Sequence, residues 1–98
     1  MKKVLTLGLL VSVALATSGI DLSQCFNDFT CLNQSGEDFI ITRSWLSYGA
    51  FDSCGPRNVQ NAKNAGIKYV DVYMFPCRGK SASSQVSSLI SGLSSELG

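Results

Sequence analysis

The sequence predicts an α/β fold of three βα units, in the order β-α-β-α-β-α with parallel strands, over residues 17–98. Two runs rich in β-branched and aromatic residues, 38–45 and 68–75, are typical of strands. Stretches with helical spacing of apolar residues follow each of them, at 56–66 and 86–97. Strands that alternate with helices through short connections indicate parallel pairing through crossovers.

The first βα unit is the least pronounced. Residues 19–23 alternate polar and apolar side chains and predict a short strand. Residues 26–35 place Phe29 and Leu32 at helical spacing and stop at Gly36, so they predict a helix that ends at a glycine.

The second and third helices have clearer signals. Pro56 predicts the start of the second, because a proline in the first turn loses no needed hydrogen bond, and Gly66 predicts its end. The third carries one apolar stripe opposite a face made mostly of serine. That serine content would also fit a flexible linker, but the spacing favours a helix. The stripe comprises Val86, Leu89, Ile90, Leu93 and Leu97.

Residues 1–16 predict a secretory signal peptide. Two lysines precede an apolar run that ends in Ala14-Leu15-Ala16, a small-x-small cleavage pattern. The alternative is a membrane helix, but the run is well short of the roughly 20 residues that span a bilayer. We expect a secreted chain, or one sent to a phagocytic or lysosomal vacuole, with no membrane association after signal removal.

Charge and composition exclude several classes of function. The first sixteen residues hold two of the eight basic residues and none of the seven acidic ones, so the remainder has a net charge of −1. Such a chain has no positive field for nucleic acid. The sequence contains no histidine, which excludes Ser-His-Asp and Cys-His catalysis. Carboxylates, hydroxyls or thiols must carry any chemistry, and we expect no cofactor and no metal.

Four cysteines in an oxidising compartment indicate disulfides rather than an all-cysteine metal site, because no CxxC pair is present. Three connectivities are possible. We predict Cys54–Cys77, since both follow adjacent strands at their carboxyl ends, and Cys25–Cys31 across the first βα loop. The sequence also contains one glycosylation sequon, Asn33-Gln34-Ser35.

Strand alternation predicts which side chains share a face. Phe39, Ile41, Arg43 and Trp45 fall on one face of the second strand, and Tyr69, Asp71, Tyr73 and Phe75 on one face of the third. A charge in mid-strand is costly to bury without a partner. Arg43 and Asp71 are therefore expected to form a structural ion pair, with a direct catalytic role for Asp71 as the alternative.

Several segments together resemble glycoside hydrolase family 25, the Chalaropsis-type lysozymes, in their cysteine-bearing eukaryotic branch. The resemblance runs in order over residues 19–97 without large gaps. Its segments are Gly19-Ile20-Asp21-Leu22-Ser23-Gln24, Phe39-Ile40-Ile41-Thr42-Arg43, Asn58, Asn61-Ala62, Ala65-Gly66-Ile67 and Tyr69-Val70-Asp71-Val72-Tyr73-Met74-Phe75-Pro76-Cys77.

The resemblance implies a TIM-like β/α barrel and a muramidase that cleaves the β-1,4 bonds of peptidoglycan, the glycan of the bacterial cell wall. It implies that Asp21 is a catalytic-cleft aspartate and that Tyr73 lines the cleft; we add Trp45 as a substrate-binding candidate on the predicted inner face. On sequence alone, Asp21 would also fit an ordinary strand-end cap.

Two departures from the family bear on activity. Leu46 stands where many bacterial members have a glutamate, and the paired carboxylates of a fourth strand would lie beyond Gly98. Glu96, in the last helix, cannot replace them. A closed eight-stranded barrel needs about 200 to 250 residues. We therefore expect residues 17–98 to be the N-terminal part of a lysozyme barrel, truncated and inactive as an isolated chain.

Two other functions are consistent with the sequence. One is a secreted, non-catalytic, disulfide-stapled module that binds glycan or a protein partner through aromatic side chains. The other is a membrane-active helix over 81–97, which the lack of lysine on its polar face disfavours. The sequence does not determine the oligomeric state. The aromatic candidates are Trp45, Tyr48, Phe51, Tyr73 and Phe75.

Overall fold

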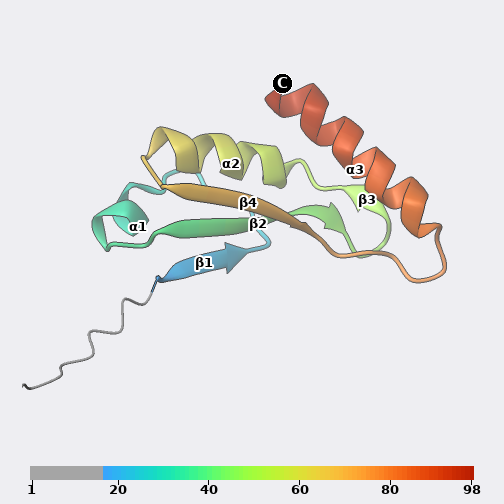
Figure 1. Cartoon of the computed structure of the whole chain (residues 1–98), viewed down its shortest axis with the longest axis horizontal. Helices are drawn as coiled ribbons and strands as arrows, with labels where there is room; N and C mark the ends of the chain where they lie inside the picture. The colour runs from blue at the N-terminus through green and yellow to red at the C-terminus, as the bar shows by residue number, and fades with distance from the viewer. Residues whose placement is uncertain (1–16) are drawn as a thin grey trace, which may run out of the picture.

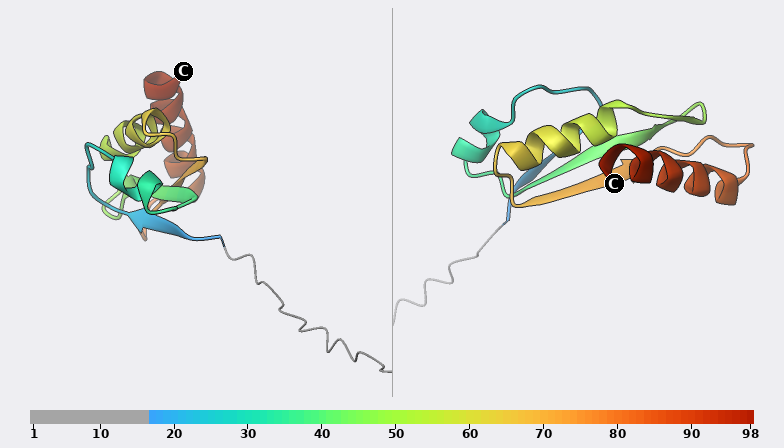
Figure 2. Two further views of the ribbon diagram at one scale, coloured as in Figure 1. Left: turned by 90° about the vertical axis from the view of Figure 1, so that its left-hand side faces the viewer. Right: turned by 90° about the horizontal axis from the view of Figure 1, so that it is seen from above.

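The computed structural model describes residues 17–98, and the predicted signal peptide lies outside them. The chain forms one sheet with its helices on one side, as Figures 1 and 2 show. In order, the elements are β1 (Gly19–Leu22), α1 (Thr30–Gln34), β2 (Phe39–Leu46), β3 (Ala50–Phe51), α2 (Cys54–Asn64), β4 (Tyr69–Met74) and α3 (Ala82–Leu97). The α/β class and the three predicted strands, β1, β2 and β4, are therefore confirmed.

The sheet is mixed rather than wholly parallel. β1 and β4 both pair in parallel with residues Phe39–Thr42 of β2, so β2 is the central strand. β3 was not predicted. It pairs antiparallel with the end of β2, Trp45 opposite Phe51, after a tight turn in which Gly49 has φ +92°. This hairpin reverses the chain before α2 begins.

One face of the sheet carries the core. Phe29, Ile40, Ala62 and Ile67 form a buried cluster, with Ile20, Leu22, Leu32, Ala65 and Val70 packed against it. α2 contributes Val59 and Ala62 at helical spacing, and its first turn approaches β2 closely. A Cβ on Gly55 would lie 2.9 Å from the Arg43 carbonyl oxygen, so glycine permits this approach.

α1 is shorter than predicted and begins just after a side-chain turn at Asp28. The Asp28 carboxylate accepts hydrogen bonds from the hydroxyl and the backbone N–H of Thr30. These two bonds, the hydroxyl first, hold the pKa of Asp28 below its usual value of 3.8. The segment before it, residues 23–28, follows an irregular path instead of extending the helix.

α3 packs over the hairpin. Gly92 faces Phe51, and a Cβ there would lie 2.5 Å from the aromatic ring. The side-chain hydroxyl of Ser81 caps the helix by accepting from the backbone N–H of Ser84. Within residues 17–98, no helix has the length and apolar character needed to cross a bilayer.

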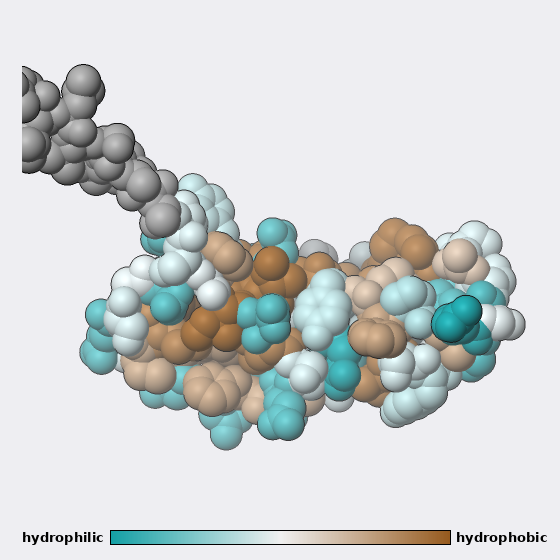
Figure 3. All heavy atoms as spheres, turned by 90° about the horizontal axis from the view of Figure 1, so that it is seen from below, coloured by the Kyte–Doolittle hydropathy of each residue, from teal (hydrophilic) through white to brown (hydrophobic). Residues whose placement is uncertain are grey.

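Among residues 17–98, no helix covers the opposite face of the sheet. Figure 3 views the molecule from that side, where apolar and polar side chains lie together at the surface. The register places Asp21, Ile41 and Asp71 at one level across β1, β2 and β4, and pairs Arg43 with Tyr73 one step further along. We call these five residues the open face.

Candidate functional site

Asp21 lies at the carboxyl end of β1, on the open face, and is exposed. Asp71 is exposed on the other side of Ile41, two strand spacings away, or about 10 Å between Cα atoms. Tyr73 is half-buried on the same face. The structure thus brings Asp21 and Tyr73 to one side of the sheet, as expected.

Arg43 does not pair with Asp71. The two residues share a face, as predicted, but the Nε of Arg43 donates to Asp52 Oδ2 at 2.9 Å, and its terminal nitrogen donates to the Ser23 carbonyl at 3.0 Å. The reason is the β2–β3 hairpin, which returns Asp52 to the side of Arg43. Asp71 remains exposed at the level of Ile41. The predicted Arg43–Asp71 ion pair is therefore wrong, because the acidic partner of Arg43 is Asp52.

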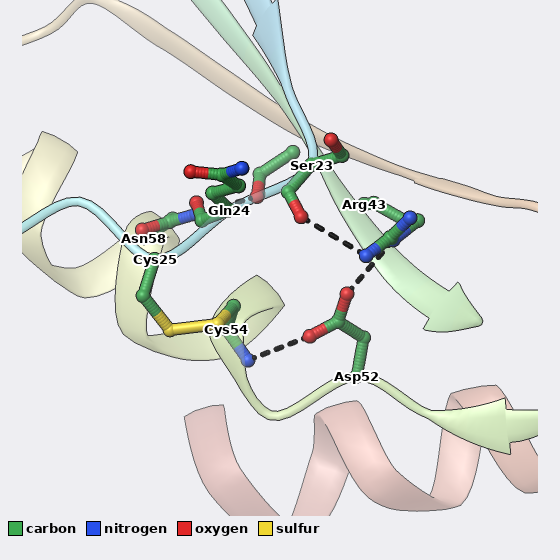
Figure 4. Close-up of polar contacts among 8 residues, drawn as sticks. Ser23, Gln24, Cys25, Arg43, Asp52, Cys54 and Asn58 are labelled. Atoms are coloured by element: carbon green, nitrogen blue, oxygen red, sulfur yellow. Dashed lines mark hydrogen bonds and ion pairs between the residues drawn. A yellow bond between two sulfur atoms is a disulfide. The ribbon is translucent and has the colours of Figure 1, made fainter.

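The disulfide scheme is also wrong. Within residues 17–98 the structure contains one bridge, Cys25–Cys54, with Cα atoms 4.7 Å apart. Among the described residues, Cys31 and Cys77 are free. The hairpin again explains the difference, because it brings the start of α2 toward the loop that follows β1. Asp52 reinforces this position, since its Oδ1 accepts from the backbone N–H of Cys54 at 3.0 Å (Figure 4).

Asn58 joins the same loop to the sheet. It is fully buried, and its Oδ1 accepts from the backbone N–H of Phe26 at 2.8 Å. Its Nδ2 donates to the Gln24 carbonyl at 2.7 Å and to Thr42 Oγ1 at 2.9 Å. One helical turn later, Asn61 Nδ2 donates to the carbonyl of Phe26 at 3.0 Å.

Together these side chains fix the segment that leaves the carboxyl end of β1. We call Arg43, Asp52, Cys54, Asn58 and Asn61 the clamp; between them they hold each of residues 23–26 by a hydrogen bond or a covalent bond. Figure 4 shows the Arg43, Asp52 and disulfide part of it. Asp52 was not singled out from the sequence. The sequence signal that could have indicated the clamp is Asn58, a polar residue beside the apolar Val59 on a helix that packs on the sheet.

Trp45 does not lie on the open face. Arg43 pairs with Tyr73 and Trp45 pairs with Met74. Ser44 therefore has no partner in β4 and is the extra residue of a bulge. This bulge breaks the alternation and turns Trp45 to the covered side, where it is 5% exposed. Its indole N–H donates to Gln85 Oε1 at 2.9 Å, which ties the sheet to α3. The predicted position of Trp45 on the inner face, beside Arg43, is therefore wrong.

Two hollows of the surface lie away from Asp21. One, of about 210 Å³, is apolar and lies between β1 and α1; it is lined by Ile20, Leu22, Phe26, Phe29 and Leu32. The second, of about 170 Å³, lies between Trp45 and the start of α3. Asp21 lines neither of them. Residues 17–98 contain no group of three or more His, Cys, Asp or Glu side chains close enough to hold a metal ion.

Comparison with known proteins identifies the family. A family model described as lysozyme-like protein 1 matches residues 12–97. "Probable GH family 25 lysozyme 2" of Dictyostelium discoideum is 51% identical over 70 residues, which cover 69% of this chain and 33% of that protein. The chain belongs to the lysozyme-like proteins of glycoside hydrolase family 25. The resemblance drawn from the sequence is thereby confirmed.

Other relatives of this lysozyme-like chain show the same partial coverage. "Lysozyme-like protein 5" of Caenorhabditis elegans is 43% identical over 67 residues, covering 66% of this chain and 31% of that protein. "Probable GH family 25 lysozyme 4" of Dictyostelium discoideum is 39% identical over 64 residues, covering 63% and 30%. The chain spans about a third of the length of these curated relatives. No solved structure gives a significant match.

Proposed function

We propose that residues 17–98 form the first βα units of a TIM-like barrel lysozyme that hydrolyses β-1,4 bonds of bacterial peptidoglycan. The observation that carries this proposal is the position of Asp21, exposed at the carboxyl end of a parallel strand with the following loop held by the clamp. In β/α barrels the working residues lie at the carboxyl ends of the strands.

The open face supports the barrel. In a closed barrel the side of the sheet away from the helices becomes the interior, and here that side carries Asp21, Tyr73 and the half-buried Ile41. The strands β1 and β4 are the outer members of the parallel set, and each can accept a further strand. Additional βα units pairing there would cover the open face and give Asp21 a cleft.

The chemistry requires a partner for Asp21. Glycoside hydrolysis usually uses two carboxyl groups, about 5–5.5 Å apart in retaining enzymes and about 6.5–9.5 Å apart in inverting ones. The family resemblance assigns the second to a further strand. We therefore propose that residues 17–98 contribute one catalytic carboxylate and part of the cleft wall, and have no muramidase activity by themselves.

A chimera separates these claims. Residues 17–98 replace the matching segment of the Dictyostelium lysozyme 2, and clearing of a bacterial cell suspension is measured. We expect the chimera to be active, and Asp21→Asn to lower its activity by at least about 10²-fold. Asp71→Asn is the matched control, since Asp71 lies on the same face at the same level. A loss on Asp71→Asn with none on Asp21→Asn would overturn the assignment, and clearing by the isolated chain would contradict its inactivity.

We also propose secretion, or delivery to a phagocytic or lysosomal vacuole. The Cys25–Cys54 bridge supports an oxidising compartment. Recovery of the chain from the medium with Thr17 as its first residue would support both secretion and the predicted cleavage site. A chain retained in the cytosol with reduced thiols would contradict this part of the proposal.

A binding module is the second candidate. Tyr48 and Phe75 are 67% and 55% exposed, which favours stacking on sugar rings, whereas Trp45 is buried and Phe51 lies under α3. If the isolated chain sediments with insoluble peptidoglycan, and Tyr48→Ala or Phe75→Ala abolishes this, binding without hydrolysis is its activity. No sedimentation would exclude this candidate.

A further inference from the structure

The sequon lies at the end of the molecule opposite the candidate site. Asn33 belongs to α1, which lies beside the amino ends of the strands in Figure 1, whereas Asp21 is near the carboxyl end of β1. Asn33 and Ser35 are both exposed. No other Asn-x-Ser/Thr triplet occurs in the sequence. A group attached at Asn33 would therefore project away from the carboxyl ends of the strands.

The surroundings of the Asn33 amide leave room for such a group. Its Nδ2 donates one hydrogen bond, to the Ala65 carbonyl at 2.9 Å, and carries a second hydrogen. The neighbouring residue is Gly66, where a Cβ would lie 3.2 Å from Nδ2. Because glycine presents no side chain there, the amide is reached from solvent while it stays attached to the end of α2.

We propose that Asn33 is an N-glycosylation site of this chain. The oligosaccharide comes from a lipid-diphosphate-linked donor in the secretory pathway, so the inference rests on the proposed secretion. The bond between the anomeric carbon and the diphosphate oxygen breaks, a bond from that carbon to Nδ2 forms, and Nδ2 releases one proton while the lipid diphosphate leaves. The remaining N–H keeps the bond to Ala65.

This placement has a consequence for the proposed enzyme. The glycan would lie beyond the amino ends of the strands, where it adds hydrophilic volume to a chain with a net charge of only −1 after residue 16. It would leave the open face and the clamp uncovered. We therefore expect glycosylated and deglycosylated chains to differ in solubility and in protease sensitivity near α1, and to have the same disulfide.

The test is expression of the full chain in a eukaryotic secretory host, followed by treatment with an amidase that releases N-linked glycans. We expect one enzyme-sensitive band shift, lost completely in Ser35→Ala and retained in Ser35→Thr. Ser35→Ala is preferred to Asn33→Gln because it removes the sequon and keeps the Asn33–Ala65 hydrogen bond. A second chain, in which an established cleavable signal replaces residues 1–16, tests glycosylation independently of the native leader.

The outcomes are distinguishable. A glycan in the second chain alone supports the site and contradicts the native signal peptide. Failure of both chains to shift, while the Cys25–Cys54 bridge shows that they entered the oxidising compartment, overturns the inference and leaves the proposed secretion intact. A shift that persists in Ser35→Ala would place the glycan elsewhere and also overturn it.

Discussion

Replacing Asn58 with leucine should destabilise this chain more than any other substitution of similar volume in α2. Asn58 is fully buried and its amide makes three hydrogen bonds, to Phe26, Gln24 and Thr42. Leucine fills a similar space and removes all three. The Thr42 hydroxyl is itself fully buried, so it would lose its amide donor where water cannot replace it.

The magnitude follows from which partners regain water. An unpaired buried polar group costs about 1–3 kcal/mol, which applies to Thr42. The Gln24 carbonyl and the Phe26 N–H belong to exposed residues and can hydrogen-bond to water instead. Each lost bond there therefore costs only the net value of about 0.5–1.5 kcal/mol. We expect Asn58→Leu to lower the free energy of unfolding by about 4 kcal/mol, a large part of the 5–15 kcal/mol typical of a domain.

The assay is urea unfolding of the oxidised chain, followed by the fluorescence of Trp45, the single tryptophan. Asn61→Leu is the matched control. It removes one hydrogen bond to the same loop, from a residue that is only half-buried, and should cost about 1 kcal/mol or less. If the two variants unfold at the same urea concentration, Asn58 does not hold the loop in the way the hydrogen bonds indicate.

Three further predictions concern other parts of the fold. Gln85→Leu should lower the free energy of unfolding by about 2–3 kcal/mol, because its buried amide accepts from the Trp45 indole N–H and hydrogen-bonds to both backbone groups of Cys77. An unchanged urea midpoint would contradict this. Gly55→Ala should lower the free energy of unfolding by about 1–3 kcal/mol, because the added methyl group clashes with the Ser44 hydroxyl. Adding Ser44→Gly in a double variant should restore part of this stability, which thermal unfolding measures. Because the hydrogen bonds from Thr30 lower the pKa of Asp28, they stabilise the fold above its ordinary pKa of 3.8, and this stabilisation is lost as the pH falls through the lower folded value. Asp28→Asn should flatten acid unfolding in that range, and an unaltered acid profile would refute a role for the Asp28–Thr30 bonds.

The long elements could be predicted because each has a repeating signal. β2 and β4 are runs of β-branched and aromatic residues, and α3 carries an apolar stripe from Val86 to Leu97. β3 could not be predicted in the same way, since two residues are too few to show alternation. Period-two alternation placed Ile41 with Arg43 on one face of β2 and Asp71 with Tyr73 on one face of β4, and it was correct up to Arg43. Beyond it, the bulge at Ser44 ended that regularity and moved Trp45 to the covered side.

The errors in polar and covalent partners have a common origin in the hairpin. Without β3, residues 46–55 appear as a loop that leads away from β2 toward the third strand. Cys54 then pairs most simply with Cys77, and Arg43 with Asp71. With β3 in place, the chain turns back along β2, and Asp52 and Cys54 meet Arg43 and Cys25 instead. Long-range partners depend on where a turn directs the chain, and this turn had no strong sequence signal.

The clamp concentrates stabilisation at the end of the molecule that carries Asp21. The Cys25–Cys54 bridge closes a separation of 29 residues, worth about 3–4 kcal/mol on the chain-entropy estimate. The hydrogen bonds of Asn58 add a comparable amount. Both act on the loop that follows β1, so contacts within residues 17–98 hold the segment next to Asp21 in place. A barrel built on this unit would therefore close around an aspartate whose backbone is already fixed.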